Sequence, residues 1–520
     1  MIGRIFTVGG FTLLSRITGF ARDIMLAAIL GAGPVADAFF VALRLPNHFR
    51  AIFAEGAFNA AFIPAYARIR TQDGPDPAKL FADRVFTMMV AVQLVLLAVA
   101  LVFTSDVISL LAPGFRDDPG RFALATELTR ITFPYLLLVS LVTLYGGILN
   151  SIHHFATPAA APILLNLSMM ATLALAAFFP SAGHAAAWGV FIAGILELLL
   201  VVGDAGRAQV LAWFSWPRID ENVRKFFRAL GPATVGSAGV QLAMFADTII
   251  ASFLAAGAIS ALYYADRINQ LPIGVIGIAI GTVLLPEMSR RLAAGDEPGA
   301  RHAQNRAIEL TLLLTIPCLV AFLLIPDLIM RALFLRGKFT ADDALAAGAT
   351  LAAYAIGLIP YVLIRSMTAP FFARGDTATP VKASLIAVAI NILIKIALMG
   401  PLAQVGLAIA TAIGAWVNLG LVTWFASRAG IAAMDARLKS SIVLLTASGC
   451  VFGIVIFMSS RAVTALYRDL PTFRDEASLA TLALFGGIVY AALIVLLLGR
   501  NWFGAFRGEK QLPAVQPTPD

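Results

Sequence analysis

The chain has 520 residues, of which 60% are hydrophobic and 13% are charged, and its mean hydropathy is +0.87. Soluble proteins carry about 25% charged residues, so this composition, with long apolar runs from end to end, excludes a soluble globular protein and indicates a polytopic helical membrane protein. The apolar runs do not alternate, which excludes a β-barrel, and the net charge of +8 follows the loops, which argues against nucleic acid as a partner.

About fourteen apolar segments reach the roughly 20 residues that a membrane helix needs. They are residues 4–30, 35–65, 84–112, 122–150, 157–180, 184–210, 229–256, 260–287, 305–335, 344–373, 380–399, 404–427, 439–462 and 477–499. The predicted fold class is therefore an all-α polytopic membrane protein.

Lysine and arginine gather in alternate loops. One set of loops is basic, around Arg68, Arg207, Arg290, Arg374 and Arg428, whereas the other set is nearly bare apart from exceptions such as Arg116 and Arg121. The positive-inside rule places the basic loops, and with them both termini, in the cytoplasm. Charges interrupt any cleavable signal sequence, so we expect the first helix to act as its own insertion signal.

An internal repeat predicts two lobes. ADAFFVALRLPN (36–47) resembles ISALYYADRINQ (259–270), with Asp37 aligned to Ser260, Phe40 to Tyr263 and Arg44 to Arg267. The copies are six spans apart and have the same orientation, which implies an axis along the membrane normal. The predicted parts are an N-terminal lobe (1–212), an amphipathic cytoplasmic linker at the membrane interface (213–228), a C-terminal lobe (229–430), two extra helices (431–500) and a cytoplasmic tail (501–520).

The first two spans carry charges that a lipid-facing helix would not carry. These are Arg16, Arg22, Asp23, Asp37, Arg44, Arg50 and Glu55. A charge at the bilayer centre costs at least about 2.5–3.5 kcal/mol, so such residues are expected to face a wet cavity or one another. Asp37 and Arg44 lie within about 20° of each other on one helix face, and Ser260 and Arg267 repeat their spacing.

A cavity between the lobes would thus hold arginines, together with Asp266 of the second lobe. Guanidinium groups recognise phosphate or carboxylate with two parallel hydrogen bonds, so an anionic ligand is the natural partner. The alternative is structural: Arg22 with Asp23, and Asp266 with Arg267, could form interhelical pairs or extend to the interface, and Glu55 could simply pair with Arg50. Pro272, Gly274, Gly277 and Gly281 similarly allow either a hinge or close helix packing.

A second polar group lies in later spans. It consists of Asp247, Asn391, Lys395 and Thr411. Asn391 and Lys395 are one turn apart on one face, and Asp247 could pair with Lys395, which would lower the cost of burying each. This group is either an ion or proton coupling site or a structural buried pair.

Catalytic and metal-binding patterns are not found. The sequence has no phosphate-binding loop, no nucleophile paired with a histidine and no metal-ligand spacing among its five histidines. We expect neither an enzyme nor a cofactor.

Several motifs resemble those of the MurJ (MviN) family of lipid II flippases, which belongs to a superfamily with the MATE drug exporters. They are SRITGFARD (15–23), GAGPVADAFFVALRLPN (31–47), FAEGAFNAAFIP (53–64), APGF (112–115), ITFPYLLL (131–138), ASFLAAGAISALYYADR (251–267) and GTVLLP (281–286). The similarity extends over nearly all the predicted spans.

The resemblance implies a V-shaped fold of fourteen helices in the bacterial inner membrane. It implies translocation of the undecaprenyl-diphosphate-linked peptidoglycan precursor, lipid II, from the cytoplasmic to the periplasmic leaflet. Family residues match here as Arg16, Arg22, Asp37, Arg50, Ser260, Asp266 and Arg267, while Arg44 keeps a positive charge where relatives have lysine. The last two helices would hold the polyprenyl tail. Beyond lipid II and membrane lipids, the cell-wall synthesis machinery is a candidate partner, and we expect a monomer.

The resemblance also bears on energy coupling. Some family members bind sodium in the second lobe, and Asp247, Asn391 and Thr411 match that site, but Lys395 replaces a carboxylate. Its ammonium group would stand in for the cation, so sodium coupling is not expected here, and the membrane potential is the remaining candidate.

Four other functions remain open from the sequence. A MATE-type exporter of cationic drugs, or an exporter of another polyprenyl-linked oligosaccharide, would share the fold, although a drug cavity should be rich in carboxylates. A membrane enzyme acting on polyprenyl phosphates would change its substrate chemically. A scaffold for cell-wall assembly would not need the arginines.

Overall fold

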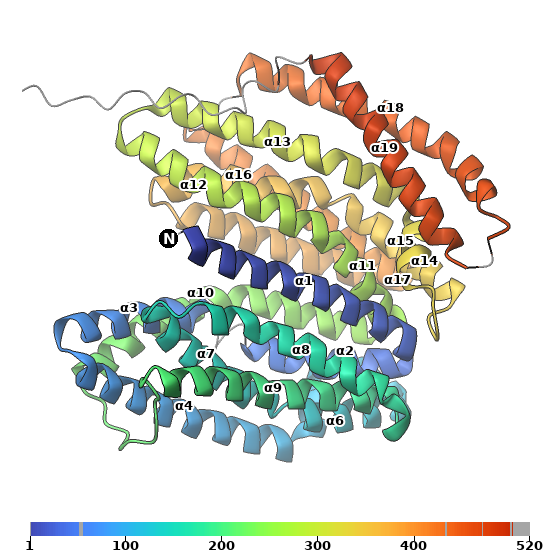
Figure 1. Ribbon diagram of the computed structural model, residues 1–520. Helices are drawn as coiled ribbons and strands as arrows, with labels where there is room; N and C mark the ends of the chain where they lie inside the picture. Colours follow the sequence, from blue (N-terminus) through green and yellow to red (C-terminus); the bar gives the residue numbers. More distant parts are fainter. Residues whose placement is uncertain (1, 51–55, 432–433, 471, 500–501, 503–520) are drawn as a thin grey trace, which may run out of the picture. The chain divides into compact units, whose positions relative to one another are not determined.

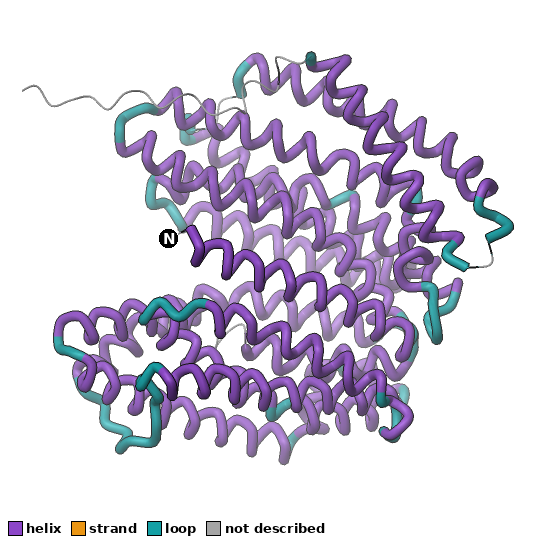
Figure 2. The backbone as a smooth tube through the Cα atoms, in the orientation of Figure 1, coloured by secondary structure: helices purple, strands orange, loops and turns teal. Residues whose placement is uncertain are grey.

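The computed structural model describes residues 2–50, 56–431, 434–470, 472–499 and 502, and in these ranges it contains helices and loops but no strand (Figure 2). The first half of the chain (Figure 1) forms α1 (Ile2–Leu30), α2 (Pro34–Arg50), α3 (Gly56–Gln72), α4 (Pro75–Val102), α5 (Thr104–Leu111), η2 (Pro113–Asp117), α6 (Pro119–Thr132), α7 (Tyr135–Ser151), α8 (Ala156–Ala174), η3 (Ala176–Phe178), α9 (Ala182–Arg207) and α10 (Glu221–Ser252). The second half forms α11 (Ala258–Pro272), the π-helical turn η4 (Ile273–Gly277), α12 (Ile278–Ala293), α13 (Glu297–Leu324), α14 (Pro326–Phe334), α15 (Ala341–Ala355), α16 (Leu358–Ala373), α17 (Ala378–Arg428), α18 (Ala436–Leu466) and α19 (Arg474–Leu498).

The all-α membrane fold class is confirmed. Among the described residues, ten helical stretches are long and apolar enough to cross a membrane, so the chain is a multi-pass membrane protein. Several predicted spans are divided in the structure, for example residues 84–112 into α4 and α5, and 344–373 into α15 and α16. The second division lies at Gly357, where a Cβ atom would come within 2.7 Å of the Ala412 Cα atom. Such close backbone contacts have no signature in the hydrophobic pattern.

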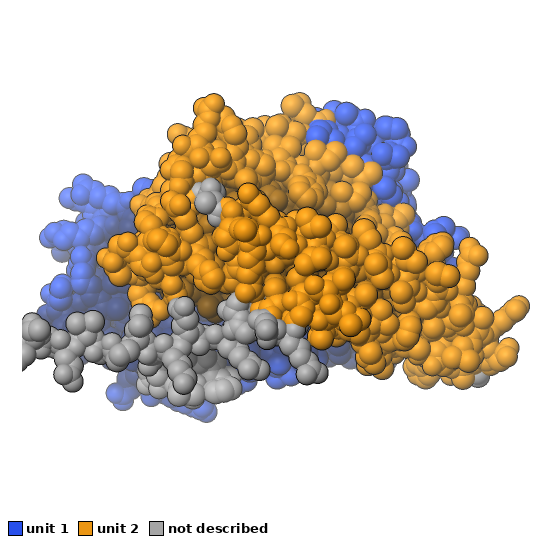
Figure 3. Space-filling model, turned by 90° about the horizontal axis from the view of Figure 1, so that it is seen from above, with its two compact units in different colours: residues 1–264, 333–347, 394–407 blue, residues 265–332, 348–393, 408–520 orange. Residues whose placement is uncertain are grey.

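The chain packs as two compact units (Figure 3). Unit 1 contains residues 1–264, 333–347 and 394–407, and unit 2 contains residues 265–332, 348–393 and 408–520. Contacts within the structure define these units, whereas the repeat in the sequence defines the predicted lobes, residues 1–212 and 229–430. The two lobes therefore stay a prediction.

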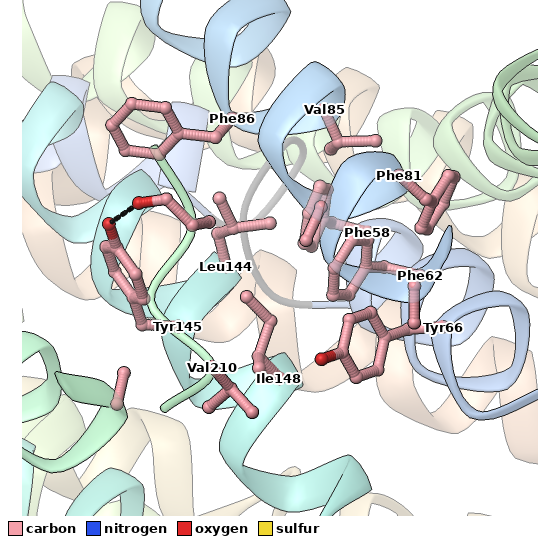
Figure 4. Close-up of a cluster of buried hydrophobic side chains, with 14 of the residues drawn as sticks. Phe58, Phe62, Tyr66, Phe81, Val85, Phe86, Leu144, Tyr145, Ile148 and Val210 are labelled. Carbon is pink, nitrogen blue, oxygen red and sulfur yellow. Dashed lines mark hydrogen bonds between the residues drawn. The ribbon is translucent and has the colours of Figure 1, made fainter. Parts of the chain in front are cut away.

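A group of aromatic side chains packs together within one core of unit 1 (Figure 4). Phe58, Phe62 and Tyr66 on α3 meet Phe81 on α4, and Phe226 on α10 closes the cluster. The rings of Phe62 and Phe81 stack with centroids 5.6 Å apart, while Phe226 meets both edge-on. Aromatic pairs with such geometry add about 0.5–1.5 kcal/mol beyond the area that they bury.

The predicted linker is held as a strap across α4. Residues 210–220 are not helical, and α10 begins at Glu221. The backbone N–H groups of Trp213 and Ser215 donate to Asp83 Oδ1 at 2.8 Å and to Thr87 Oγ1 at 2.9 Å. The Tyr145 hydroxyl donates to the Ala212 carbonyl at 2.7 Å (Figure 4). The side chains of Trp213 and Trp216 remain exposed, and the position of this segment at the membrane interface stays a prediction.

In unit 2 a buried carboxylate joins α13 to α18. Glu309 is fully buried and accepts hydrogen bonds from Arg306 Nη1 at 2.6 Å and from the Ser441 hydroxyl at 2.8 Å. The Trp502 indole N–H donates to the same Ser441 hydroxyl at 3.1 Å. The charge of Glu309 is thus paired with Arg306 inside the protein. A fully buried carboxylate needs such a partner, because burying an unpaired charge is costly.

Two irregular segments interrupt the long helices. Within α17, Ala403 has φ +46° and ψ −130°, and a Cβ atom on Gly406 would lie 2.9 Å from the Leu398 side chain. The predicted spans 380–399 and 404–427 are therefore two arms of one tight hairpin. In the predicted span 260–287, the π-helical turn η4 follows Pro272 directly, and π-turns within helices are frequent at functional sites.

Two glycines of α9 provide a test of this packing. A Cβ atom on Gly189 would lie 2.8 Å from the Met169 Cα atom of α8, whereas a Cβ atom on Gly203 would meet nothing within 4 Å. We expect Gly189→Ala to lower the free energy of unfolding by about 1–3 kcal/mol through overpacking, and Gly203→Ala to leave it unchanged or raise it by up to about 1 kcal/mol. Thermal unfolding of the purified protein in detergent measures both. Equal effects of the two variants would contradict the α8–α9 contact.

Candidate functional site

Arg22 is buried in α1 inside a network of polar groups. Its Nε and Nη2 atoms donate to Asp23 Oδ1 at 3.1 and 2.7 Å, and its Nη1 atom donates to Asn166 Oδ1 on α8 at 3.0 Å. The Asn166 amide in turn donates to the Ser15 carbonyl at 3.0 Å. The Tyr263 hydroxyl donates to the same Asp23 oxygen at 3.0 Å. The guanidinium plane is therefore held from several sides, which reduces the conformational entropy that binding an anion would cost.

Asp37 is fully buried and caps the N-terminus of α11. Its Oδ2 atom accepts the backbone N–H of Gly257 at 2.7 Å, and its Oδ1 atom accepts the backbone N–H of Ser260 at 2.9 Å and the Ser260 hydroxyl at 2.6 Å. A carboxylate at this position satisfies backbone donors that the helix leaves unpaired and complements the helix dipole. The predicted site residues Asp37 and Ser260 thus bind one another.

Residues at equivalent positions in the repeat contact each other here. Asp37 is aligned with Ser260 and bonds to it, and Phe40 is aligned with Tyr263 and stacks on it with ring centroids 3.9 Å apart. Equivalent residues can meet in this way only where an approximate two-fold axis passes between the two segments. The contacts therefore strengthen the weak repeat in the sequence.

The other predicted arginines of unit 1 differ in their surroundings. Arg44 is partly buried and its Nη1 atom donates to the Thr248 hydroxyl of α10 at 3.2 Å. Arg16 is exposed on α1. Arg50 is partly buried and interacts electrostatically with Glu197, a buried carboxyl group on α9 that also accepts from the Tyr135 hydroxyl at 3.4 Å. Glu55 lies outside the described residues.

Asp266 and Arg267 belong to unit 2 and are partly buried on α11. The Asp266 carboxylate accepts the Gln270 amide at 3.4 Å. A single cavity shared by Arg267 and the arginines of unit 1 stays a prediction.

Lys395 and Asp247 form an ion pair within unit 1. The Lys395 Nζ atom lies 2.5 Å from Asp247 Oδ1, with the lysine side chain 4% exposed and the aspartate 43% exposed. Asn391 instead packs against the backbone at Gly414, where a Cβ atom would come within 2.8 Å of its amide nitrogen, and Thr411 lies one turn before Gly414. The structure thus pairs Asp247 with Lys395, as expected, and places Asn391 and Thr411 in unit 2. A role in coupling stays a prediction.

Three residues of these networks escaped the sequence analysis. Asn166 is a lone amide in the apolar span 157–180 and could have been flagged for that reason. Tyr263 was noticed only as part of the repeat. Arg121 was treated as a loop residue, but it lies buried in the first turn of α6 with its Nη1 atom 3.5 Å from Asp37. The sequence around Arg121 gives no hint of that contact.

These residues are suited to recognising an anionic ligand. Arginine forks, amides and hydroxyls can bind a phosphate or carboxylate, and charge-assisted bonds of this kind are about twice as strong as neutral ones. Within the described ranges, no group of three or more His, Cys, Asp or Glu side chains is placed to hold a metal ion.

The unequal burial of the Asp247–Lys395 pair gives a prediction. Asp247→Asn removes the carboxylate from a buried ammonium group, and we expect a loss of about 3–5 kcal/mol in unfolding free energy. Lys395→Met leaves a half-exposed carboxylate and an apolar side chain of similar length, so we expect a loss within about 1 kcal/mol. Denaturation in detergent of both variants and of the double variant checks this. A larger loss for Lys395→Met than for Asp247→Asn would refute it.

Comparison with known proteins identifies the family. The family model described as "Lipid II flippase MurJ" matches residues 26–471. A probable lipid II flippase MurJ from Rhizobium tropici is 38% identical, over 100% of this chain and 98% of its own, and the lipid II flippase MurJ from Burkholderia cenocepacia is 32% identical over 95% and 96%.

Solved structures agree on the fold. "Lipid II flippase MurJ, inward closed conformation" superposes with a TM-score of 0.80 at 23% identity, covering 94% of this chain and 98% of that one. An inward-facing multidrug MATE family transporter of the MOP superfamily superposes with a TM-score of 0.67 at 14% identity, covering 84% and 98%. Together the family match over residues 26–471 and the full-length relatives show that this chain belongs to the MurJ family of lipid II flippases.

Proposed function

We propose that this protein moves lipid II from the cytoplasmic to the periplasmic leaflet of the bacterial inner membrane by alternating access, with both termini in the cytoplasm. The observation that carries the proposal is Arg22, a guanidinium group buried in α1, a predicted membrane span, and oriented by Asp23 and Asn166, in a chain of a flippase family. Intramembrane arginines mark substrate or ion pathways by default.

The arginines match the chemistry of a diphosphate. A guanidinium group keeps its charge at any physiological pH and binds two oxygens of a phosphate at once. Arg22, held in place, would give the site its orientation, and the exposed Arg16 with the partly buried Arg44, Arg50 and Arg267 would add positive charge. The diphosphate–sugar head would cross inside the protein and remain chemically unchanged.

The helices after the second lobe suit the polyprenyl tail. The surfaces of α18 and α19 expose apolar side chains, among them Phe457 at 59% and Met458 at 73% on α18, and Leu484 and Ile488 at 71% each on α19. A long isoprenoid chain needs only continuous apolar surface, because the hydrophobic effect has no directional preference. In this proposal the tail stays in the bilayer along these helices while the head crosses.

The positive charge of the proposed cavity indicates an energy source for transport. A cavity with an excess of arginines returns empty and positive, and the membrane potential contributes about 2.3 kcal/mol per elementary charge per 100 mV to such a movement. In this proposal the ammonium group of Lys395, which pairs with Asp247, stands in for a bound cation. In this proposal the potential, rather than sodium, biases the return.

The rival is a MATE-type drug exporter, which the shared fold alone would permit. A cavity for cationic drugs needs carboxylates to balance their charge, whereas Asp23 and Asp37 are already bonded to protein donors. Resistance assays in a host without its own drug pumps separate the two, because our proposal expects no gain in resistance.

Alanine substitutions test the diphosphate site. We expect Arg22→Ala and Arg267→Ala to abolish complementation of a strain depleted of its own flippase, because a diphosphate loses a charge-assisted partner. Leaflet-resolved detection of lipid II should show that the precursor remains in the cytoplasmic leaflet, and protein abundance is measured beside it because Arg22→Ala also leaves the buried Asp23 without its guanidinium partner. Arg290→Ala is the control, since Arg290 is exposed at the end of α12 and pairs with Glu287. Full flipping by both cavity variants would reject the role of these arginines.

A further inference from the structure

The turn between α10 and α11 is held by a buried arginine. Arg121 in the first turn of α6 is 7% exposed, and its Nη1 atom lies 3.5 Å from Asp37 Oδ2. Its Nη2 atom is 3.5 Å from the carbonyl oxygens of both Ser252 and Leu254, at the C-terminal end of α10. Arg121 thus contacts α2 and α10 at once.

The charges suit the two helix ends that they contact. The C-terminus of α10 carries the partial negative charge of its dipole and receives the guanidinium group, whereas the N-terminus of α11 carries the partial positive charge and receives the Asp37 carboxylate. Each charge stabilises a helix end, and the two charges attract each other. The turn at residues 253–257 is therefore clamped from α2 and α6.

Gly114 lets the backbone of η2 lie close against the C-terminal end of α10. The Gly114 N–H of η2 donates to the Ser252 hydroxyl at 3.1 Å, and a Cβ atom on Gly114 would lie 2.5 Å from the Ser252 carbonyl carbon and 2.6 Å from the Phe253 Cα atom. The Arg121 guanidinium also lies over the Phe115 ring, 4.1 Å from its centroid. Any side chain at position 114 would push the end of α10 away.

These contacts are of a kind that can break and form again. They connect side chains to the ends of two helices beside the turn residues Phe253, Ala255 and Ala256, which are exposed, and the three bonds from Arg121 are all at the long limit of 3.5 Å. Bonds of this length are individually weak. Leu254 within the turn is buried while the turn is held, so release of the turn would expose it.

We propose that Arg121 and Gly114 form, with Asp37, a latch that keeps the α10–α11 turn closed at one end of the transporter and that releases it once in each transport cycle. This inference rests on the proposed function, since it assigns a step to alternating access. Arg121 is a positioning residue in this scheme: it holds the turn and does not contact the substrate.

Accessibility of a cysteine at the turn tests the latch without any substrate. Leu254 is 7% exposed, and Leu254→Cys would be introduced after replacement of the native Cys318 and Cys450 by alanine. A membrane-impermeant maleimide would be added from the side opposite to the termini. We expect Arg121→Ala and Gly114→Ala each to raise the labelling rate about tenfold over the otherwise unchanged protein, because both shift the closed–open equilibrium.

A matched control separates the latch from a general effect of charge. Arg116→Ala removes an exposed arginine from the neighbouring η2 segment, and we expect it to leave the labelling rate unchanged. Arg121→Lys keeps the charge but loses the guanidinium fork, so its rate should be intermediate.

Results that overturn the latch can be distinguished from results that reject the proposed function. An unchanged labelling rate in folded Gly114→Ala and Arg121→Lys proteins would overturn the latch, whatever their flipping activity. Equal acceleration by Arg116→Ala would also overturn it. Absence of lipid II flipping in the unmodified protein would reject the function instead, and it would be seen in the transport assay alone.

Discussion

The cost of placing a charge inside a membrane governs the polar architecture of this protein. Three buried charges have protein partners: Arg22 has Asp23, Glu309 has Arg306, and Lys395 has Asp247. An unpaired ion at such depth would cost several kcal/mol. Pairing removes most of that cost and fixes the geometry of each side chain. Arg22 can therefore be both buried and held in one orientation.

Residues at equivalent positions of the repeat meet in complementary pairs. Asp37 bonds to Ser260 and Phe40 stacks on Tyr263, and each pair consists of equivalent positions in the two copies. A carboxylate facing its own copy would suffer repulsion. Serine at the second copy turns the same position into a donor. The contact between the two copies is therefore an attractive helix cap, in which Asp37 accepts from Gly257 and Ser260.

Hydropathy predicted the fold because a bilayer requires long apolar helices, and all the predicted spans fall on helices where the chain is described. It did not predict where the helices are interrupted, because the break at Gly357 depends on the approach of Ala412 from a distant segment. The charges at Arg22 and Asp37 were visible as anomalies in apolar runs. Their partners Asn166 and Arg121 could not be assigned to them, since a partner is fixed by packing between helices and not by local spacing. Whether the predicted arginines share one cavity therefore stays a prediction.

The hairpin at Ala403 has a consequence for biogenesis. Its turn, residues 400–404, contains no charged residue, and Leu398 packs against Gly406 across it. The two arms are therefore expected to leave the insertion machinery as one folded hairpin rather than one after the other. Lys395 on the first arm would enter the bilayer next to α10, which is synthesised earlier and already carries Asp247. Order of synthesis thus supplies the counter-ion before the cation arrives.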